Sequence, residues 1–352
     1  MSQAPTNAGA VHAEREALRA YPPTVTFRDL IASNKRRSAI LMVALVLILV
    51  ILGALIAAAI GPAVAAVEGQ PGESLKPEDI IPSALLGGAA ALAFGTIACA
   101  WSWFGGASAI LGMAGAVPIE KKDDPQLFNV VDELRLAAGL PMPRVYLIPS
   151  KAMNAFATGR DPKHAAVAIT TTLREKLTRD ELAGVIAHEL AHVRHYDVRF
   201  MMLMATLVGL IVFLCDVFLR SLRHARFRGS SKSSKGGGPL IILMLVLALI
   251  FAIIAPILAT FIQLAISRQR EYLADAGAVE LTRYPEGLAS ALRKLADEST
   301  PLDPDKANRA IAHLYIINPL KKALRSHGSL DSAFSTHPPV EKRIARLMAL
   351  TR

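Results

Sequence analysis

Two histidines one helical turn apart, with a glutamate between them, are the residues of this chain best suited to chemistry. They lie in the segment His188–His192, which reads His-Glu-Leu-Ala-His. Residues four apart share one face of an α-helix, so the side chains of His188 and His192 can bind one tetrahedral metal ion. Glu189 is turned about 100° around the helix and can hold a metal-bound water instead. The pattern predicts zinc-dependent hydrolysis of an amide bond, with Glu189 as the catalytic base.

The residues around this motif indicate a helix that positions it. Thr178 and Glu181 have the spacing of a capping box, which marks a helix N-terminus. Apolar residues then recur at helical spacing and predict a buried face: Leu182, Val185, Ile186, Leu190 and Val193. A chance match on a solvated helix is the alternative interpretation. The buried face and the glutamate favour the metal site.

A catalytic zinc site of this type needs a third protein ligand. The candidate is Glu271, which follows a long apolar stretch. Asp275 lies one turn further along the same face, where it could accept a hydrogen bond from a metal-bound imidazole. For the Glu271 segment, a solvated face of mixed charges is the alternative.

Composition indicates a membrane protein. The 352 residues are 53% hydrophobic, and their mean hydropathy is +0.38. Each of four apolar stretches is near or above the roughly 20 residues that cross the hydrocarbon core as a helix. The stretches lie between residues 37 and 68, 79 and 120, 200 and 219, and 239 and 266. Because the first follows a polar arm of residues 1–37, we interpret it as a retained anchor.

Charge and cysteine content exclude other classes. The net charge of +10 comes largely from basic residues beside the apolar stretches, where topology and anionic lipid explain them, so no nucleic-acid partner is expected. Cys99 and Cys215 both fall inside apolar stretches and are interpreted as small hydrophobic residues. Neither a disulfide framework nor a cysteine-bound zinc is predicted.

The basic residues predict that the N-terminus and the histidine motif face the cytoplasm. Lys35, Arg36 and Arg37 precede the first stretch, and the loop after it is mainly acidic. The loop at residues 220–235 opposes this assignment, because it is basic without one acidic residue although it would lie outside. The third and fourth stretches therefore either span the membrane or form a hairpin on the cytoplasmic side.

Residues 117–199 are predicted to form a compact α/β segment. An amphipathic helix should end near Gly139, and strands are expected at Val145–Ile148 and Ala166–Thr171. An edge strand beside the motif helix could hold an extended peptide by backbone pairing. Alternatively, the strands are simply core.

The predicted fold is a mainly α membrane protein with about four apolar helices and a cytoplasmic α+β protease domain of the zincin (gluzincin) type. Its parts are a polar arm at 1–37, two transmembrane helices at 38–116, protease segments at 117–199 and 267–352, and an apolar helix pair at 200–266. The protease domain is thus expected to be built from segments on both sides of the third and fourth helices.

Four motifs in order resemble HtpX-type membrane zinc peptidases, which are related to the CAAX prenyl endopeptidases. They are Asn154–Gly159, the His188–His192 helix with Asp197 beyond it, the Glu271 segment, and Ser335–Pro339 followed by Arg343 and Leu347. The resemblance covers roughly residues 38–350, and the arm before it is longer than the family usually shows. It implies one zinc ion per chain, with Glu271 as third ligand. Under the resemblance, Asn154, just before the edge strand, either binds the substrate backbone or is an ordinary turn residue. Asp197 either orients a ligand histidine or ends the soluble part of its helix. The resemblance also implies that His337 approaches the zinc and steadies an oxyanion as a catalytic residue, although a lone histidine in a loop is more often a surface residue.

The resemblance also implies a function. It predicts a multi-pass protein of the bacterial inner membrane whose active site faces the cytoplasm and cleaves misfolded or damaged membrane-associated proteins in stress-linked quality control. Polypeptide substrates and the lipid bilayer are the expected partners, and the oligomeric state stays unknown. Two alternatives remain: a CAAX-type protease of lipidated substrates, or a non-catalytic membrane scaffold or chaperone with structural zinc. Glu189 argues against the scaffold, since a structural site would not need it.

Overall fold

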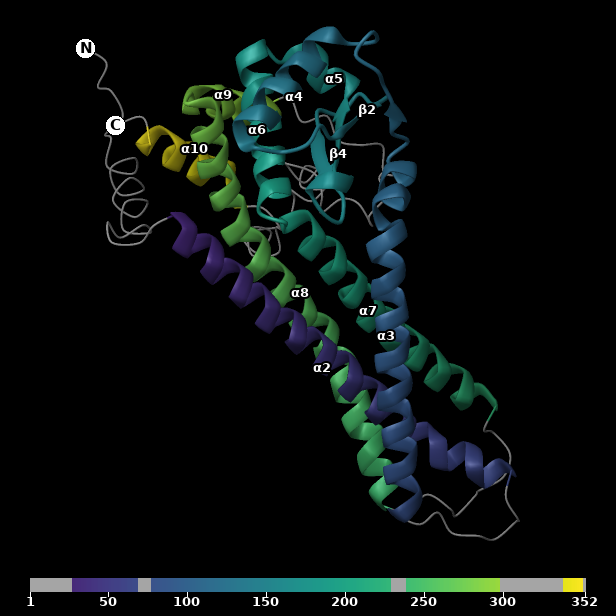
Figure 1. The fold of residues 1–352 in the computed structure, drawn as a ribbon. Coiled ribbons are helices and arrows are strands. Elements are labelled where there is room, and N and C mark those ends of the chain that lie inside the picture. The colour runs from purple at the N-terminus through teal and green to yellow at the C-terminus, as the bar shows by residue number, and fades with distance from the viewer. Residues whose placement is uncertain (1–26, 69–76, 229–238, 298–337, 351–352) are drawn as a thin grey trace, which may run out of the picture. The chain divides into compact units, whose positions relative to one another are not determined.

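The computed structural model describes residues 27–68, 77–228, 239–297 and 338–350, most of which are helical (Figure 1). The chain divides into two compact units. The site unit, which contains the histidine motif, comprises Met1–Arg37, Trp103–Met201 and Leu264–Arg352. The apolar unit comprises Ser38–Ser102 and Met202–Gln263. Three segments of the chain therefore form the site unit, and two form the apolar unit.

The apolar unit is built from parts of four long helices. These are α2 (Phe27–Glu68), α3 (Pro77–Met113), α7 (Asp197–Arg228) and α8 (Pro239–Thr282). Each is long and apolar enough, by length and composition, to cross a membrane over part of its course: Ala39–Ile60, Ile80–Met113, Asp197–Ser221 and Leu245–Ile262. The prediction of about four apolar helices is confirmed. The first helix begins at Phe27, inside the segment expected to be a polar arm.

Helices α2 and α3 approach closely at small residues. A Cβ atom on Gly53 would lie 2.5 Å from the Cβ of Ala91, and one on Gly87 would lie 2.5 Å from the carbonyl oxygen of Gly53. Small residues allow two backbones to make dense contacts, which matters in lipid because burial of apolar surface there drives no association. In the same unit, Thr206 of α7 donates a hydrogen bond to the hydroxyl of Ser102 in α3 at 2.9 Å.

A four-stranded sheet in the order β1-β2-β4-β3 forms one layer of the site unit. Its strands are β1 (Val117–Pro118), β2 (Arg144–Ile148), β3 (Ala155–Thr158) and β4 (Ala166–Thr170). The central strands β2 and β4 are parallel, and β1 and β3 pair with them in antiparallel fashion. The strands expected near residues 145 and 166 are therefore the central pair. Strand β3 lies at the edge and begins directly after Asn154.

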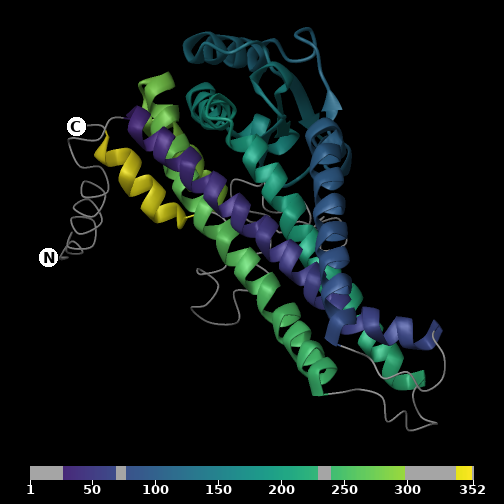
Figure 2. The ribbon, with the colours of Figure 1, turned by 60° about the horizontal axis from the view of Figure 1, so that its bottom comes forward.

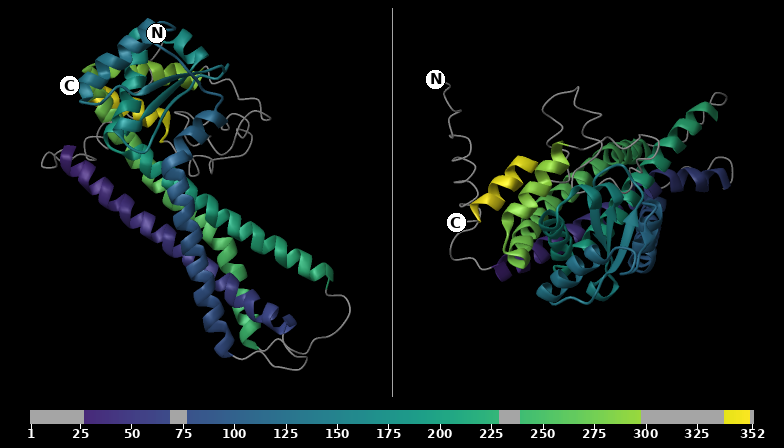
Figure 3. Two further views of the ribbon diagram at one scale, coloured as in Figure 1. Left: turned by 45° about the vertical axis from the view of Figure 1, so that its right-hand side comes forward. Right: turned by 90° about the horizontal axis from the view of Figure 1, so that it is seen from above.

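Helix α6 (Arg179–Arg194) carries the histidine motif and packs between β3 and α9 (Pro285–Asp297), as Figure 3 shows. The predicted capping box of Thr178 and Glu181 begins α6. Helix α4 (Pro125–Ala138) packs on α6 and ends at Gly139, whose φ of 68° is the left-handed conformation that glycine adopts without steric cost. These elements share one hydrophobic core: Leu127, Val131, Ile169, Leu173, Leu182, Ile186, Leu190, Leu288 and Leu292.

The end of α3 and a C-terminal helix complete the site unit. The last turns of α3 cover the other face of the sheet, where Leu111 packs with Phe156 and Ala168. This segment of the unit starts at Trp103, within α3. At the C-terminal end of the unit, α10 (Val340–Ala349) lies beside the last part of α8 (Figure 2) and buries Arg343 and Leu347.

Glu181 holds α6 against α9. Its carboxylate accepts hydrogen bonds from Lys294 Nζ and Ser290 Oγ, both at 2.7 Å, and from the backbone N–H of Thr178 at 2.8 Å. Burial alone raises the pKa of this carboxyl. The hydrogen bonds outweigh burial and lower the pKa from 4.5 to about 2.

We expect Glu181→Gln to remove a pH-dependent part of the stability. A carboxyl whose pKa is lower in the folded state stabilises the fold above its unfolded pKa, and this contribution is lost as the pH falls towards the folded pKa. Between about pH 5 and 2, wild-type protein should therefore lose up to roughly 3 kcal/mol more than Glu181→Gln. The measurement is the unfolding free energy against pH, with Glu175→Gln, an exposed carboxylate of α5 (Thr171–Lys176), as control. Parallel curves for all three proteins would contradict the assignment.

Candidate functional site

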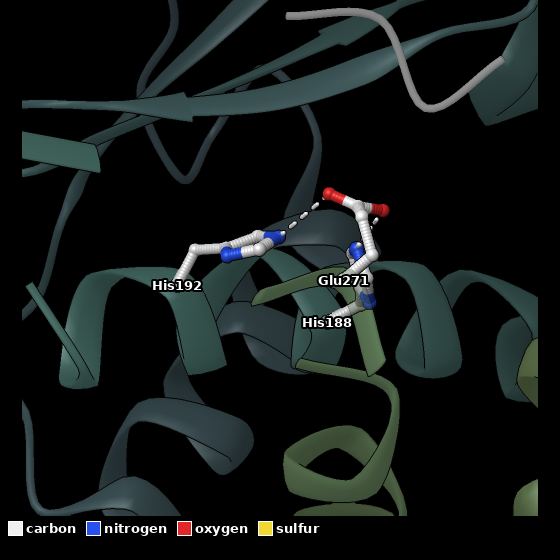
Figure 4. A group of neighbouring side chains, drawn as sticks. All are labelled: His188, His192 and Glu271. Atoms are coloured by element: carbon white, nitrogen blue, oxygen red, sulfur yellow. Dashed lines mark ion pairs between the residues drawn. The ribbon is translucent and has the colours of Figure 1, made fainter. Parts of the chain in front are cut away.

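His188, His192 and Glu271 converge in the site unit (Figure 4). The histidines project from successive turns of α6 towards Glu271, which comes from α8. Nε2 of His188 lies 3.6 Å from Oε2 of Glu271, and Nε2 of His192 lies 3.5 Å from Oε1. One potential ligand atom of each residue lies within 4.8 Å of the others, and all three side chains are buried. The structure brings together the three predicted ligands, which could hold one metal ion.

Each histidine contacts a second carboxylate through its other ring nitrogen. Nδ1 of His188 lies 3.0 Å from Asp275, and Nδ1 of His192 lies 3.2 Å from Asp197. Such contacts fix the orientation and tautomer of an imidazole and leave its Nε2 for a metal. Asp275 and Asp197 therefore lie where the sequence placed them, and Asp197 also begins α7. Their roles at a metal stay predictions.

Two buried arginines complete the site, and sequence analysis assigned neither of them a role. Arg343 donates from Nε and Nη2 to the carboxylate of Asp275 at 2.9 and 2.7 Å, and its Nη1 lies 3.2 Å from Oε2 of Glu271. Arg270 donates to the carbonyl oxygen of Asp197 at 2.9 Å. The position of Arg343 in the C-terminal motif was the sequence signal for it. Nothing in that pattern relates it to Asp275, 68 residues away.

The charges buried around the site fit a divalent cation. Four carboxylates and two guanidinium groups in this region are each at most 5% exposed: Glu189, Asp197, Glu271, Asp275, Arg270 and Arg343. With neutral imidazoles, four negative and two positive charges leave two negative charges, which protons on the two imidazoles or one divalent cation would balance. A divalent ion bound by two imidazoles and a carboxylate would balance them, and this ligand set suits zinc.

Protons compete with a metal at this site. Burial alone lowers the pKa of His192, but its hydrogen bonds with Asp197 and Glu271 outweigh burial and raise the pKa to about 10. For His188, burial is likewise outweighed by Asp275 and Glu271, which raise its pKa. Because a metal binds the neutral imidazole, metal affinity should fall as the pH falls.

Glu189 is held by the edge strand. Its Oε2 accepts a hydrogen bond from the backbone N–H of Ala157 in β3 at 2.8 Å. Burial raises the pKa of Glu189, and the charge of Glu271 adds to this, whereas His188, His192 and the Ala157 hydrogen bond oppose it. A raised pKa suits a carboxylate that must accept a proton near neutral pH.

Asn154 is buried, and its backbone pairs with Thr170. Its N–H donates to Thr170 Oγ1, and its carbonyl oxygen accepts from the N–H of Thr170, each at 2.9 Å. These hydrogen bonds fix the start of β3, three residues before Ala157. The predicted role of Asn154 in substrate binding stays a prediction. His337 lies outside the residues that the structure describes.

The fold and the site define a membrane metalloprotease, a hydrolase. The profile of Peptidase family M48 matches residues 121–351, and the chain belongs to that family. The chain is similar to the protein named Protease HtpX homolog of Dictyoglomus thermophilum, with 47% identity over 238 residues that cover 68% of this chain and 73% of the relative. It is also similar to the Protease HtpX homolog of Lactobacillus helveticus, with 40% identity over 318 residues, 90% of this chain and 97% of the relative. The predicted enzyme class and the resemblance to HtpX-type peptidases are confirmed.

A solved structure is also similar, the crystal structure of S. mikatae Ste24p. The TM-score is 0.45 at 20% sequence identity, and the match covers 73% of this chain and 57% of that chain. The match therefore spans a little over half the length of the solved protein.

We expect Glu271 and Asp275 to differ in their effect on metal binding. Glu271→Ala removes one of three protein ligands and should abolish stoichiometric metal. Asp275→Asn leaves all three ligands in place and should weaken affinity by about 10- to 100-fold. Metal content and chelator competition of the purified proteins measure this, with Asp132→Asn on the surface of α4 as control. Normal metal content in Glu271→Ala would show that another residue is the third ligand.

Proposed function

We propose that this protein is a zinc-dependent membrane endopeptidase that cleaves misfolded or damaged polypeptides associated with its membrane. The observation that carries the proposal is the convergence of His188, His192 and Glu271. Beside them, Glu189 accepts a hydrogen bond from the edge strand β3. Membership of a metalloprotease family supports the reaction class. Two imidazoles and one carboxylate, with a net buried charge that a divalent ion balances, support one zinc ion per chain.

The mechanism follows from the positions of the chain's own groups. His188, His192 and Glu271 would hold the zinc ion, which when bound supplies a polarised water with a pKa near 7. The carboxylate of Glu189 takes a proton from the attacking water and passes it to the leaving amine nitrogen. Asp275 and Asp197 keep the two imidazoles in orientation, and Arg343 keeps the carboxylates of Glu271 and Asp275 in place.

Strand β3 supports binding of an extended substrate. Strand β3 pairs with β4 in antiparallel fashion, and just before it the carbonyl of Asn154 points to Thr170. Every second residue from Asn154 onwards therefore directs its backbone N–H and C=O groups to β4. Ala155 and Ala157 therefore direct theirs away from the sheet, and the outward N–H of Ala157 meets Glu189. A polypeptide paired along this edge would place a peptide bond beside the base. Recognition through backbone groups suits unfolded chains of varied sequence.

Basic residues support a cytoplasmic site unit in a bacterial inner membrane. At the boundaries between the two units, Arg37 precedes Ser38 in α2, and Arg199 lies shortly before Met202 in α7. In α8, Arg268 and Arg270 follow Gln263 on the same side. Positive charge beside spans favours the cytoplasmic face. We also keep the division into an arm at 1–37, a helix pair at 38–116, protease segments at 117–199 and 267–352, and a helix pair at 200–266 as part of this proposal.

We expect Glu189→Gln to separate catalysis from metal binding. The glutamine keeps the side-chain volume but cannot accept the proton, so zinc content should stay near one per chain while casein hydrolysis falls by roughly two to four orders of magnitude. Zinc analysis and peptide release from casein by the full-length protein in detergent measure both properties. Glu175→Gln serves as the control. Undiminished hydrolysis by Glu189→Gln would refute the mechanism.

The orientation has its own test, a membrane-impermeant thiol reagent applied to cells with permeabilised outer envelopes. Single cysteines in a background lacking Cys99 and Cys215 would be placed at Ser74, Ser150, Ser231 and Ser329, of which only Ser150 lies within the described residues. Ser74 should be labelled, and Ser150 and Ser329 should be protected. We expect label at Ser231, because the third and fourth stretches are long enough to span. Protection there indicates a cytoplasmic hairpin, and label at Ser150 or Ser329 reverses the orientation.

A further inference from the structure

A shallow, open pocket lies in the site unit at the end of β3 and the start of α7. Arg160 and Arg199 line it together with Thr158 and Tyr196. Neither the metal ligands nor Glu189 line this pocket, so the proposed reaction does not account for it. Two arginines in one pocket indicate an anionic ligand.

Arg199 is surrounded by aromatic rings. Its guanidinium carbon lies 5.3 Å from the ring centre of Trp103 and 5.2 Å from those of Tyr196 and Phe200. Within the part of the chain that the structure describes, no carboxylate pairs with Arg199. The rings hold the side chain in position through cation–π contacts while its N–H donors stay available for an anion.

Arg160 also lines the pocket and lies against a ring, and its Nη2 is 2.9 Å from Nε2 of His164. Its guanidinium lies 5.5 Å from the ring centre of Phe104. The carboxylate of Asp161 also lines the pocket, 3.5 Å from Arg160, and is shared with His164 at 2.8 Å. With Arg199 and Arg160 against Asp161, the formal charge of the pocket is positive.

Thr158 supplies an independent sign of a ligand. It is 1% exposed and lines the pocket, and its hydroxyl has no hydrogen-bond partner among the described residues. A buried hydroxyl without a partner is unfavourable, because it has lost its hydrogen bonds to water. An anion in the pocket would accept a hydrogen bond from it and remove this cost.

The pocket lies at the level where the helices enter the apolar spans. The apolar part of α3 begins at Ile80, and about 20 residues cover a hydrocarbon core of about 30 Å, which places the interface near residue 100. Trp101 and Phe104 are 64% and 73% exposed there, as expected of side chains at headgroup depth. In α7 the apolar part begins at Asp197, so Arg199 lies in its first turn.

We propose that this pocket binds the headgroup phosphate of an anionic phospholipid. Arg199 and Arg160 pair with the phosphate oxygens, Thr158 donates its hydroxyl proton, and the aromatic rings hold the arginines at headgroup depth. The pocket adjoins the candidate active site along the chain, because Thr158 follows Ala157 and Val193 follows His192. A bound lipid therefore fixes the ends of β3 and α6, the two elements that hold Glu189 and the histidines.

The test measures lipid binding without reference to proteolysis. Full-length protein freed of native lipid is titrated with short-chain phosphatidylglycerol, short-chain phosphatidylcholine and inorganic phosphate, and bound lipid is counted by native mass spectrometry. Arg199→Gln and Arg160→Gln should each weaken phosphatidylglycerol binding by about tenfold or more, and Thr158→Val by several-fold. Arg144→Gln is the matched control, since Arg144 also stacks on a ring, that of Tyr146 at 5.8 Å, outside the pocket.

Each outcome decides the proposal. Selective loss of phosphatidylglycerol in the pocket variants, with wild-type affinity in Arg144→Gln, supports it. Equal binding by wild type and all variants overturns it, as does equal affinity for phosphatidylcholine or for inorganic phosphate. If the variants keep lipid binding but lose a preference for peptides with acidic residues, the pocket binds substrate and the proposal is wrong. Because Thr158→Val keeps the shape of the side chain, it tests the site even where an arginine variant unfolds. An inactive wild-type protein that still binds phosphatidylglycerol would refute only the proposed function.

Discussion

The site unit depends on one constraint: charged groups buried in its interior must be compensated by opposite charges and hydrogen bonds. An ionised carboxylate removed from water costs several kcal/mol unless opposite charges and hydrogen bonds replace its hydration. Four such groups lie around the histidine motif, and two buried arginines contact three of them, Asp197, Glu271 and Asp275. This explains why elements far apart in sequence must meet. Helix α6 brings the histidines, α8 brings Glu271 and Asp275, and α10 brings the guanidinium that pairs with both carboxylates.

The same constraint assigns a structural purpose to the C-terminal segment. Arg343 is fully buried and contacts Asp275 with two donors, so removal of α10 would leave two carboxylates of the site without their compensating charge. Truncating one partner of such a buried pair is far more damaging than replacing both. The site is therefore completed only when the last described helix packs on α9 and brings Arg343 to Asp275 of α8.

Strand β3 connects catalysis with the arginine pocket. Its Ala157 N–H holds the proposed base, its outward backbone groups suit an extended polypeptide, and its last residue, Thr158, lines the pocket. This four-residue strand can therefore contact the base, the substrate and the arginine pocket. An edge strand leaves the backbone groups of one side unpaired and directs its side chains to both faces of the sheet.

The sequence by itself determined the local features. A spacing of four puts His188 and His192 on one helix face, Thr178 and Glu181 cap that helix, and long uncharged stretches form the apolar helices, because each depends on neighbours within a few residues. The central strands were also predictable from their β-branched residues, and the relation to HtpX-type peptidases from four ordered motifs. Tertiary structure alone decided which distant groups meet. It paired Arg343 with Asp275, Arg270 with Asp197, and Ala157 with Glu189, and it brought Arg160 and Arg199 into one pocket. Such contacts join residues tens of positions apart, and no local periodicity encodes them. They form because a folded interior must pair every buried charge with whichever donor or acceptor the packing of helices brings within reach.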